Sequence, residues 1–320
     1  MYKIKANYFV DDKVRHSPGI KKKLPISERG INMEFISLDH LIRDAIDMHL
    51  HPGPGAGPYR LDAIQAAQQA QQAGMKAIVL KSHSYTAAVA IIVNQLVPGI
   101  KVIGSICLNY EVGGLNYHAV ENAAGLGAKV VWMPTFSAAN SINKMRSLGL
   151  PLEGEGISLL DKTGKLVPEM DRILSIIKKN DMVLATGHIS PRETFVLIKE
   201  AYRAGIRKMV ITHPTDKEFA ENYFTVDDLK ELAAMGAFIE FTLVGMLPNE
   251  FCHDPALIVQ TIRTIGPEHC IVSTDLGQPQ NPLPVEGMRL FIATLLHHGI
   301  TQKEVELIIK SNPAILLGLD

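Results

Sequence analysis

Several features are scarce in this 320-residue sequence, and each scarcity excludes a class of protein. The three cysteines (Cys107, Cys252 and Cys270) are too few and too scattered for a disulfide framework. Neither sign of charge is in excess, since 32 Lys and Arg stand against 33 Asp and Glu, so nothing indicates a nucleic-acid or anionic-membrane partner. No apolar run reaches the roughly 18 residues of a membrane helix, and the first residues lack the apolar core of a secretory signal. We therefore expect a cytoplasmic protein with no nucleic-acid partner and no membrane partner.

What the chain does have is a regular alternation of short apolar runs with longer amphipathic stretches. Eight runs of four to eight residues are rich in Val and Ile, which is typical of buried parallel strands. The runs are Leu41–Met48, Ala77–Leu80, Lys101–Cys107, Lys129–Met133, Met182–Thr186, Lys208–Thr212, Ala237–Thr242 and Cys270–Thr274.

Helix start signals stand in the stretches between these runs. Ser190, Pro191 and Glu193 form a capping box with proline at the first helical position. Pro58 precedes an Ala- and Gln-rich stretch, 59–73, which we expect to be one helix. Further starts are Thr225 with Asp228, Asp254-Pro255, and Thr301 with Glu304. Strands and helices therefore alternate along the chain.

The spacing of the strand ends indicates the fold class. From His49 to Asp275, successive ends lie 25 to 34 residues apart, except for one step of 55 residues. Eight strand–helix units in roughly 280 residues predict an α/β protein, a (β/α)8 TIM barrel over residues 37–320 with a short N-terminal arm at 1–36. A doubly wound sheet is the rival, but no Gly-rich phosphate loop follows the first run. The long step leaves an insertion, 135–167, that we expect to form a lid.

Twelve histidines remain to be explained, and several follow the expected strands directly. In a barrel of this class the carboxyl ends of the strands form the active-site face. Alternation along the first strand places His49 and His51 on one face and Met48 and Leu50 on the other. The candidate ligands are His49 and His51 after the first strand, His188 after the fifth, His213 after the sixth and Asp275 after the eighth.

Imidazole and carboxylate groups on four strands around one axis form a ligand set for Zn²⁺ or a similar divalent ion. Each residue also has an ordinary explanation. A single histidine at a strand end is more often a hydrogen-bonded structural residue, and Asp275 could simply cap the turn that follows it. The coincidence of five such residues at the same end of their strands favours a metal site.

These residues resemble the pattern of the amidohydrolase superfamily of metal-dependent hydrolases. That pattern is His-x-His after strand one, His after strands five and six, and Asp after strand eight. The resemblance covers roughly 46–319, and the closing 311–318 looks like the last helix of many members. It implies that His49, His51, His188, His213 and Asp275 bind one or two ions, Zn²⁺ with Mn²⁺ or Fe²⁺ as alternatives. It also implies that Asp275 takes the proton from the attacking water, and that the protein is a homo-oligomer.

One position departs from the family pattern. Members with two metals place a bridging carboxylated Lys, or a Glu, at the end of strand four, where this chain reads Val130-Val131-Trp132-Met133-Pro134. Two arrangements remain open: Lys81, after strand two, is carboxylated and bridges two metals, or the site holds one metal. Lys81 could also merely neutralise Asp275 or an anionic substrate. With few residues before strand one, the chain resembles the compact, barrel-only members.

The chemistry implied is hydrolysis of a small molecule, because a bound divalent ion lowers the pKa of its water towards about 7. An amide, a cyclic amide or a lactone is the expected substrate. Deamination, decarboxylation, phosphoester hydrolysis and a non-catalytic scaffold are the alternatives. His83, two residues after Lys81, is a candidate to bind the substrate or an oxyanion, and Asp47 and Glu240 are candidates to support the metal ligands.

Overall fold

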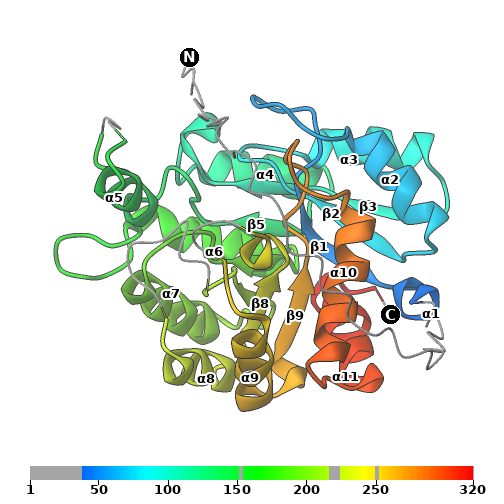
Figure 1. The fold of residues 1–320 in the computed structure, drawn as a ribbon. Coiled ribbons are helices and arrows are strands. Elements are labelled where there is room, and N and C mark those ends of the chain that lie inside the picture. Colours follow the sequence, from blue (N-terminus) through cyan, green and yellow to red (C-terminus); the bar gives the residue numbers. More distant parts are fainter. Residues whose placement is uncertain (1–37, 151–153, 216–223, 249–251, 320) are drawn as a thin grey trace, which may run out of the picture. The chain divides into compact units, whose positions relative to one another are not determined.

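The computed structural model describes residues 38–150, 154–215, 224–248 and 252–319. The expected N-terminal arm, 1–36, lies outside the described residues, so the boundary between arm and barrel stays a prediction. Figure 1 shows the described strands in the interior with helices packed around them. Among the described residues, no helix combines the length and the apolar character that crossing a membrane requires.

The strands form two parallel sheets in chain order, β1-β2-β3 and β4-β5-β6-β7-β8-β9. Their bounds are β1 Ile46–Leu50, β2 Ala77–Leu80, β3 Lys101–Ile103, β4 Ser105–Cys107, β5 Val130–Trp132, β6 Val183–Ala185, β7 Met209–Ile211, β8 Phe238–Thr242 and β9 Cys270–Ser273. Each predicted apolar run therefore contains a strand. The α/β class with parallel strands is confirmed.

The third predicted strand is divided between the two sheets. Only Gly104 separates β3, which pairs with β2, from β4, which pairs with β5. A Cβ at this position would lie 2.5 Å from the Cα of Ala87, so glycine allows the helix after β2 to approach the strand closely. The chain after β9 also bonds to β1, since the Asp275 amide donates to the His49 carbonyl (2.7 Å) and the His51 amide donates to the Leu276 carbonyl (2.7 Å).

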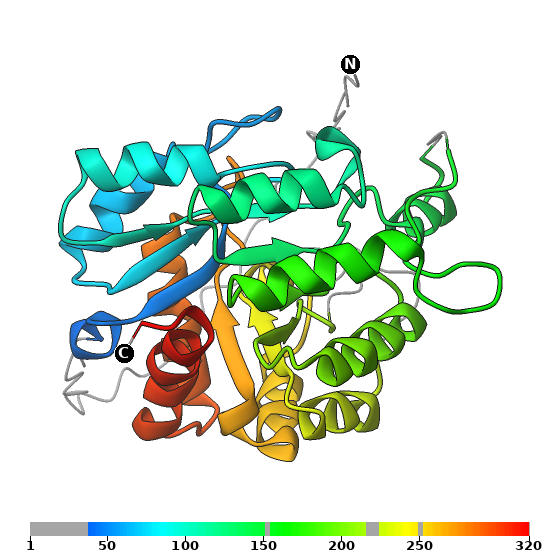
Figure 2. The ribbon, with the colours of Figure 1, turned by 180° about the vertical axis from the view of Figure 1, so that it is seen from behind.

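Apart from α1, the described helices lie between the predicted strands or after the last of them. Their bounds are α1 Asp39–Ile42, α2 Ala63–Gln72, α3 Ala87–Leu96, α4 Tyr117–Gly125, α5 Ala139–Ser147, α6 Pro168–Lys179, α7 Pro191–Ala204, α8 Val226–Ala234, α9 Pro255–Ile265, α10 Pro284–His297, α11 Gln302–Glu306 and α12 Asn312–Leu317. Four short turns of other helix types, η1 Tyr110–Val112, η2 Val244–Met246, η3 Pro267–His269 and η4 Leu307–Ser311, complete the described elements. Figure 2 shows α4 and α6 side by side on the outer face of the strands.

The predicted capping box at Ser190 is confirmed, and the helix starts predicted at Thr225 and Thr301 are capping boxes as well. Ser190, Thr225 and Thr301 each accept from the amide three residues on, and the side chain of that third residue bonds back to the cap. Asp254 caps α9 through the Ala256 amide.

Two predicted boundaries are wrong. The helix expected over 59–73 begins only at Ala63, because the chain before it is held extended by bonds from the Gly53 amide to Leu61 and from the Arg60 amide to Gly277. Asp62 then supplies the cap. The first run, expected as a strand from Leu41, contains a short helix, α1, before β1 begins at Ile46.

The buried apolar residues form two clusters that separate the two faces of the strands. The inner cluster takes alternate residues from strands of both sheets, among them Val79 of β2, Trp132 of β5 and Ile271 of β9, together with Leu316 of α12. The outer cluster joins the intervening strand residues to the surrounding helices. Period-2 alternation, read from the sequence, thus separates an interior from a helix-facing layer.

Candidate metal centre

His49 and His51 lie at the carboxyl end of β1, where the strand pairing is irregular. The register with β2 shifts between Asp47 and Leu50. Met48 packs in the inner cluster and Leu50 in the outer one, so the prediction that these two residues share a face is wrong. A register shift of this kind re-aims side chains, which is why simple alternation fails here although both imidazoles reach the same site.

The three groups His49, His51 and Asp275 are in direct contact. One carboxylate oxygen of Asp275, Oδ1, lies 3.1 Å from His49 Nε2 and 2.8 Å from His51 Nε2. The two Nε2 atoms are 3.3 Å apart. All three side chains are buried, and one ligand atom of each lies within 4.8 Å of the others. This is a compact group of two imidazoles and one carboxylate.

The backbone beside His51 admits only glycine at one position. A Cβ on Gly277 would lie 1.7 Å from the His51 carbonyl oxygen. Asp275, two residues earlier, has a φ of 55°, which is in the left-handed region. The chain after β9 therefore turns sharply against β1 and brings the Asp275 carboxylate to the two histidines.

His188 and His213 complete the cluster from two further strands. The His188 ring lies 5.0 Å from the His213 ring, and the His213 ring lies 5.7 Å from that of His49. His213 Nε2 is 3.9 Å from Oδ2, the second carboxylate oxygen of Asp275. The structure thus brings together all five residues of the predicted ligand set, with Asp275 between the two histidine pairs.

Glycine also sets the position of His188. Gly187 has a φ of 59°, and a Cβ there would lie 2.4 Å from the Met133 carbonyl oxygen. The His188 amide donates to the Pro134 carbonyl (2.9 Å). Close contact between the ends of β5 and β6 therefore directs the chain so that His188 follows the turn into the site.

Burial and mutual charge set the protonation of these groups. Burial alone raises the pKa of Asp275, but His49 and His51 overcome it and hold the pKa well below its usual range, so the group is a carboxylate. Burial lowers the pKa of His51 to about 4, and Lys81 adds to the effect. Burial, helped by His213, also lowers the pKa of His188 well below its ordinary value. Burial lowers the pKa of His49 too, but Asp275 and Glu240 outweigh burial and raise it. His51 and His188 are therefore neutral imidazoles beside a carboxylate, and this is the form in which histidine binds metal ions.

Two buried carboxylates support β1 from behind the site. Glu240 of β8 lies 3.3 Å from His49 Nδ1, the ring nitrogen that does not contact Asp275. Asp47 accepts from the Thr274 hydroxyl (2.5 Å) and amide (3.1 Å), and burial raises its pKa to about 6. Glu240 therefore contacts a candidate ligand directly, whereas Asp47 ties β1 to the residue that precedes Asp275.

Lys81 is buried at the end of β2, only 1% exposed. Its Nζ lies 5.2 Å from the centre of the Trp132 ring, and that ring lies 4.8 Å from His49. No carboxylate pairs with it among the residues the structure describes. Because the third predicted strand is split in two, β5 is the fourth strand of the family pattern. Trp132 therefore lies where that pattern has its bridging residue, and Lys81 and His49 both lie against the Trp132 ring.

His83 lies at the mouth of the cluster rather than in it. Its ring is 5.0 Å from that of His51 and 4.3 Å from that of Phe136, and its Nδ1 is 3.2 Å from the Thr135 hydroxyl. Sequence reasoning missed Phe136, a half-exposed ring that also lies 5.6 Å from His188. Its position four residues after the end of β5 was the available signal.

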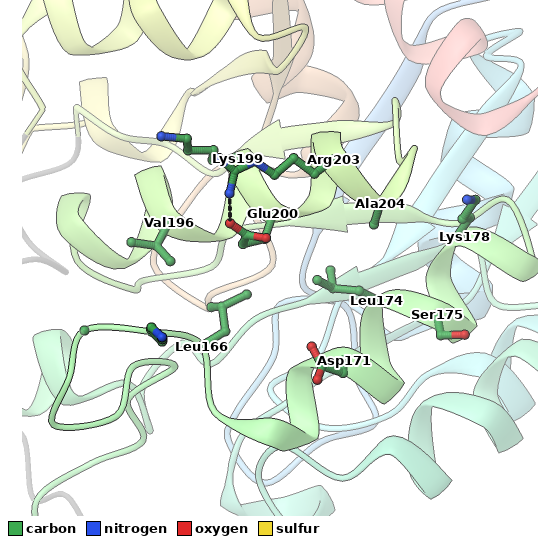
Figure 3. Close-up of a pocket in the computed structure, with 12 residues that line it drawn as sticks. Leu166, Asp171, Leu174, Ser175, Lys178, Val196, Lys199, Glu200, Arg203 and Ala204 are labelled. Carbon is green, nitrogen blue, oxygen red and sulfur yellow. Dashed lines mark hydrogen bonds and ion pairs between the residues drawn. The ribbon is translucent and has the colours of Figure 1, made fainter.

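A separate groove of about 890 Å³ lies on the outer surface between α6 and α7. Figure 3 shows Leu166, Leu174 and Val196 directed into it and Arg203 paired with Glu200 at its edge. None of the predicted site residues lines this groove. The candidate site is therefore the histidine cluster.

The donor set fits a divalent metal ion. Buried histidines, of which His51 and His188 are neutral, and an ionised carboxylate are ligands that Zn²⁺ and related ions take. An outer carboxylate on the second nitrogen of one ligand histidine is the usual companion of such a site, and Glu240 provides it.

Comparison with solved structures identifies proteins of the same fold. A probable dipeptidase from Pseudomonas aeruginosa matches at a TM-score of 0.60 and 12% identity, over 88% of this chain and 96% of that one. A putative 2-pyrone-4,6-dicarboxylic acid hydrolase from Pseudomonas putida matches at 0.60 and 16% identity, over 87% and 98%. An amidohydrolase from Pseudomonas aeruginosa matches at 0.60 and 12% identity, over 87% and 97%. The resemblance to the amidohydrolase superfamily is thereby confirmed at the level of the fold.

Sequence comparison gives a family but no activity. No curated protein matches the sequence. A family model described as a family of unknown function, DUF6282, matches residues 44–240. The match includes four of the five candidate ligands and ends before Asp275. Since the model matches more than half of the sequence, the chain belongs to the DUF6282 family.

Proposed function

We propose that this protein is a metal-dependent hydrolase of small molecules. The observation that carries the proposal is the contact of one Asp275 oxygen with both His49 and His51 while its other oxygen faces His213. His49, His51, His188, His213 and Asp275 would hold the ion. A bound ion would supply hydroxide at neutral pH and polarise a carbonyl group.

The roles of the chain's own groups follow from their positions. Asp275 is ionised and lies among the ligands, so it is placed to accept a proton from water and return it to the leaving group. His83, at the mouth, has a ring edge beside the Thr135 hydroxyl and is placed to hydrogen-bond a substrate oxygen. Phe136 covers His83 and would exclude water from that side.

We also propose that the two parallel sheets form one closed eight-stranded (β/α)8 barrel. The continuous chain through Gly104 joins them on one side, and the amide bonds between β1 and the residues after β9 join them on the other. The inner apolar cluster supports this closure because it takes side chains from strands of both sheets. A closed barrel directs all the strand ends to one mouth.

Lys81 has two roles that its surroundings support. A buried side chain with no carboxylate partner among the described residues requires a negative group from elsewhere. Carboxylation of Nζ would make Lys81 a bridging ligand between two ions. An anionic group on the substrate would instead pair with its ammonium. Of the two, we favour bridging. Lys81 would then replace the bridging residue that the family pattern has at the end of the fourth predicted strand, β5, where this chain has Trp132.

The proposed substrate is a small molecule with an amide, cyclic amide or lactone bond. Among proteins of this fold, one is described as a probable dipeptidase and another as a putative hydrolase of a 2-pyrone dicarboxylic acid, which is a cyclic ester. Zn²⁺ is the proposed ion, with Mn²⁺ and Fe²⁺ as alternatives. A cytoplasmic location and a homo-oligomeric state are part of the proposal.

Two variants test the activity. Asp275→Ala and His188→Ala should each abolish hydrolysis in a panel of dipeptides, cyclic amides and lactones that the unaltered protein cleaves. Circular dichroism should show both variants folded. Asp227→Ala, exposed on α8, is the matched control and should retain full activity. Retained activity in both site variants would contradict the proposal.

A further inference from the structure

One helix of the insertion between β5 and α6 contacts a candidate ligand. The Ser141 hydroxyl of α5 lies 3.1 Å from His188 Nδ1, and the Asn140 side-chain amide donates to the His188 carbonyl (3.1 Å). Both α5 residues are buried, at 0% and 4% exposure. His188 is therefore contacted at its ring and at its backbone carbonyl by two consecutive residues, 47 and 48 positions earlier in the chain.

Neither of these two side chains caps its own helix. The N-cap of α5 is Ala138, and no side chain caps the first turn. Ser and Asn favour helix caps and turns over helix interiors, because their side chains compete for backbone groups. Their placement in the first turn of α5, directed at His188 instead of at the helix end, indicates a use outside the helix.

The first turn of α5 is itself fixed by the returning chain. The Ala139 amide donates to the Ile157 carbonyl (2.9 Å), and the Ile157 amide donates to the Ser137 carbonyl (2.7 Å). Gly156 has a φ of 82°, and a Cβ there would lie 2.5 Å from the Ala139 Cα. The close approach of these two segments requires glycine and leaves little freedom to the start of α5.

Glu193 then connects this returning chain to the helix that follows His188. One of its carboxylate oxygens accepts from the Leu159 amide and the Ser158 hydroxyl, both at 2.8 Å. The other accepts from the Ser190 amide (2.9 Å) and hydroxyl (2.7 Å), which is the capping box of α7. A single buried carboxylate thus joins the insertion to the chain two residues after His188.

We propose that the described part of the insertion is a fixed clamp on His188 rather than a lid, and that Ser141 is a positioning residue for metal binding. A hydroxyl that accepts from the Nδ1–H group fixes the tautomer in which Nε2 carries the lone pair. Nε2 is then the nitrogen available to an ion shared with His213. This inference rests on the proposed function, because it assigns His188 a metal to bind.

Binding of Co²⁺ to the purified full chain tests the clamp. Ser141→Ala should weaken binding of the ion that His188 holds by about 10- to 100-fold, the usual cost of losing an outer partner of a ligand histidine, and should change the visible Co²⁺ spectrum. Ser141→Thr retains the hydroxyl and should restore both. Ser147→Ala, whose exposed hydroxyl bonds only within α5, is the control and should bind like the unaltered chain.

The outcomes separate this inference from the proposed function. Unchanged affinity and spectrum in Ser141→Ala, beside normal binding by the unaltered chain, would overturn the clamp and leave the proposed function standing. No binding by the unaltered chain would overturn both. Nitrogen-15 spectra of the metal-free unaltered chain give a check that needs no variant. They should show His188 protonated at Nδ1, and protonation at Nε2 would overturn the clamp.

Discussion

The two histidine pairs of the site are held by different parts of the molecule. His49 and His51 belong to the end of one strand, and a carboxylate from another strand, Glu240, contacts the first of them. His188 instead follows a turn that requires glycine, and a hydroxyl from a helix of the insertion contacts its ring. The first pair is therefore part of the strand framework, whereas the position of the second depends on a segment that packs against the framework from outside.

Asp275 is the residue that the two pairs share, so its removal should have the largest effect. Asp275→Ala removes the one carboxylate that contacts His49 and His51 and also faces His213. We expect metal bound per chain to fall below about a tenth of the unaltered value, because the loss should exceed the 10- to 100-fold cost of losing an outer partner. Elemental analysis after gel filtration measures it. Normal metal content would show that the two pairs bind without Asp275.

Lys81→Met tests whether Lys81, like Asp275, links the two histidine pairs by bridging two metal ions. If carboxylated Lys81 bridges two ions, the variant should bind one ion where the unaltered chain binds two, and added bicarbonate should no longer raise the content. Lys101→Met, an exposed lysine at the start of β3, is the control. Equal metal content in both variants, with weaker substrate binding in Lys81→Met alone, would assign Lys81 to the substrate.

Glu240→Gln should weaken only the first pair. The amide keeps the size of the side chain but removes the charge that faces His49 Nδ1. We expect affinity for the ion at His49 and His51 to fall by about 10- to 100-fold, with the Co²⁺ spectrum of the His188 side unchanged. Glu231→Gln, exposed on α8, should have no effect. Equal weakening at both pairs would show that the pairs are not held independently.

Thr274→Val should change stability more than metal binding. The substitution removes the hydroxyl that donates to the buried Asp47 and leaves that carboxyl with fewer partners. We expect the free energy of unfolding in urea to fall by about 1–3 kcal/mol. Thr264→Val, an exposed threonine on α9, should cost far less. A metal affinity that falls as much as in Glu240→Gln would mean that Asp47 acts on the ligands and not only on the strands.

The difference between the strand framework and the insertion also explains which features could be predicted from the sequence. The strands and the five candidate ligands follow from local signals, namely short Val- and Ile-rich runs and the polar residues directly after them. His49 and His51 could be found in this way although the register shift in β1 reverses the expected face of Met48. Local signals also give helix starts where a capping box is complete, as at Ser190.

Features that depend on distant segments could not be read in this way. The start of α2 is delayed to Ala63 because residues far along the chain, at Gly277, bind the preceding segment. The contact of Ser141 with His188 depends on how the insertion packs, and no periodicity in 135–167 records it. Likewise the surroundings of Lys81 depend on where β2 and β5 lie in the fold, because Trp132 of β5 contacts both Lys81 and His49.

The central claim is that the five strand-end residues hold a metal ion, and metal content per chain tests it most directly. Protein purified without chelator, with bicarbonate present, should contain one or two equivalents of a divalent metal by elemental mass spectrometry. Removal with a chelator should lower the content to zero, and added Zn²⁺ should restore it. Less than a tenth of an equivalent, even after incubation with Zn²⁺, Mn²⁺ and Fe²⁺, would contradict the account.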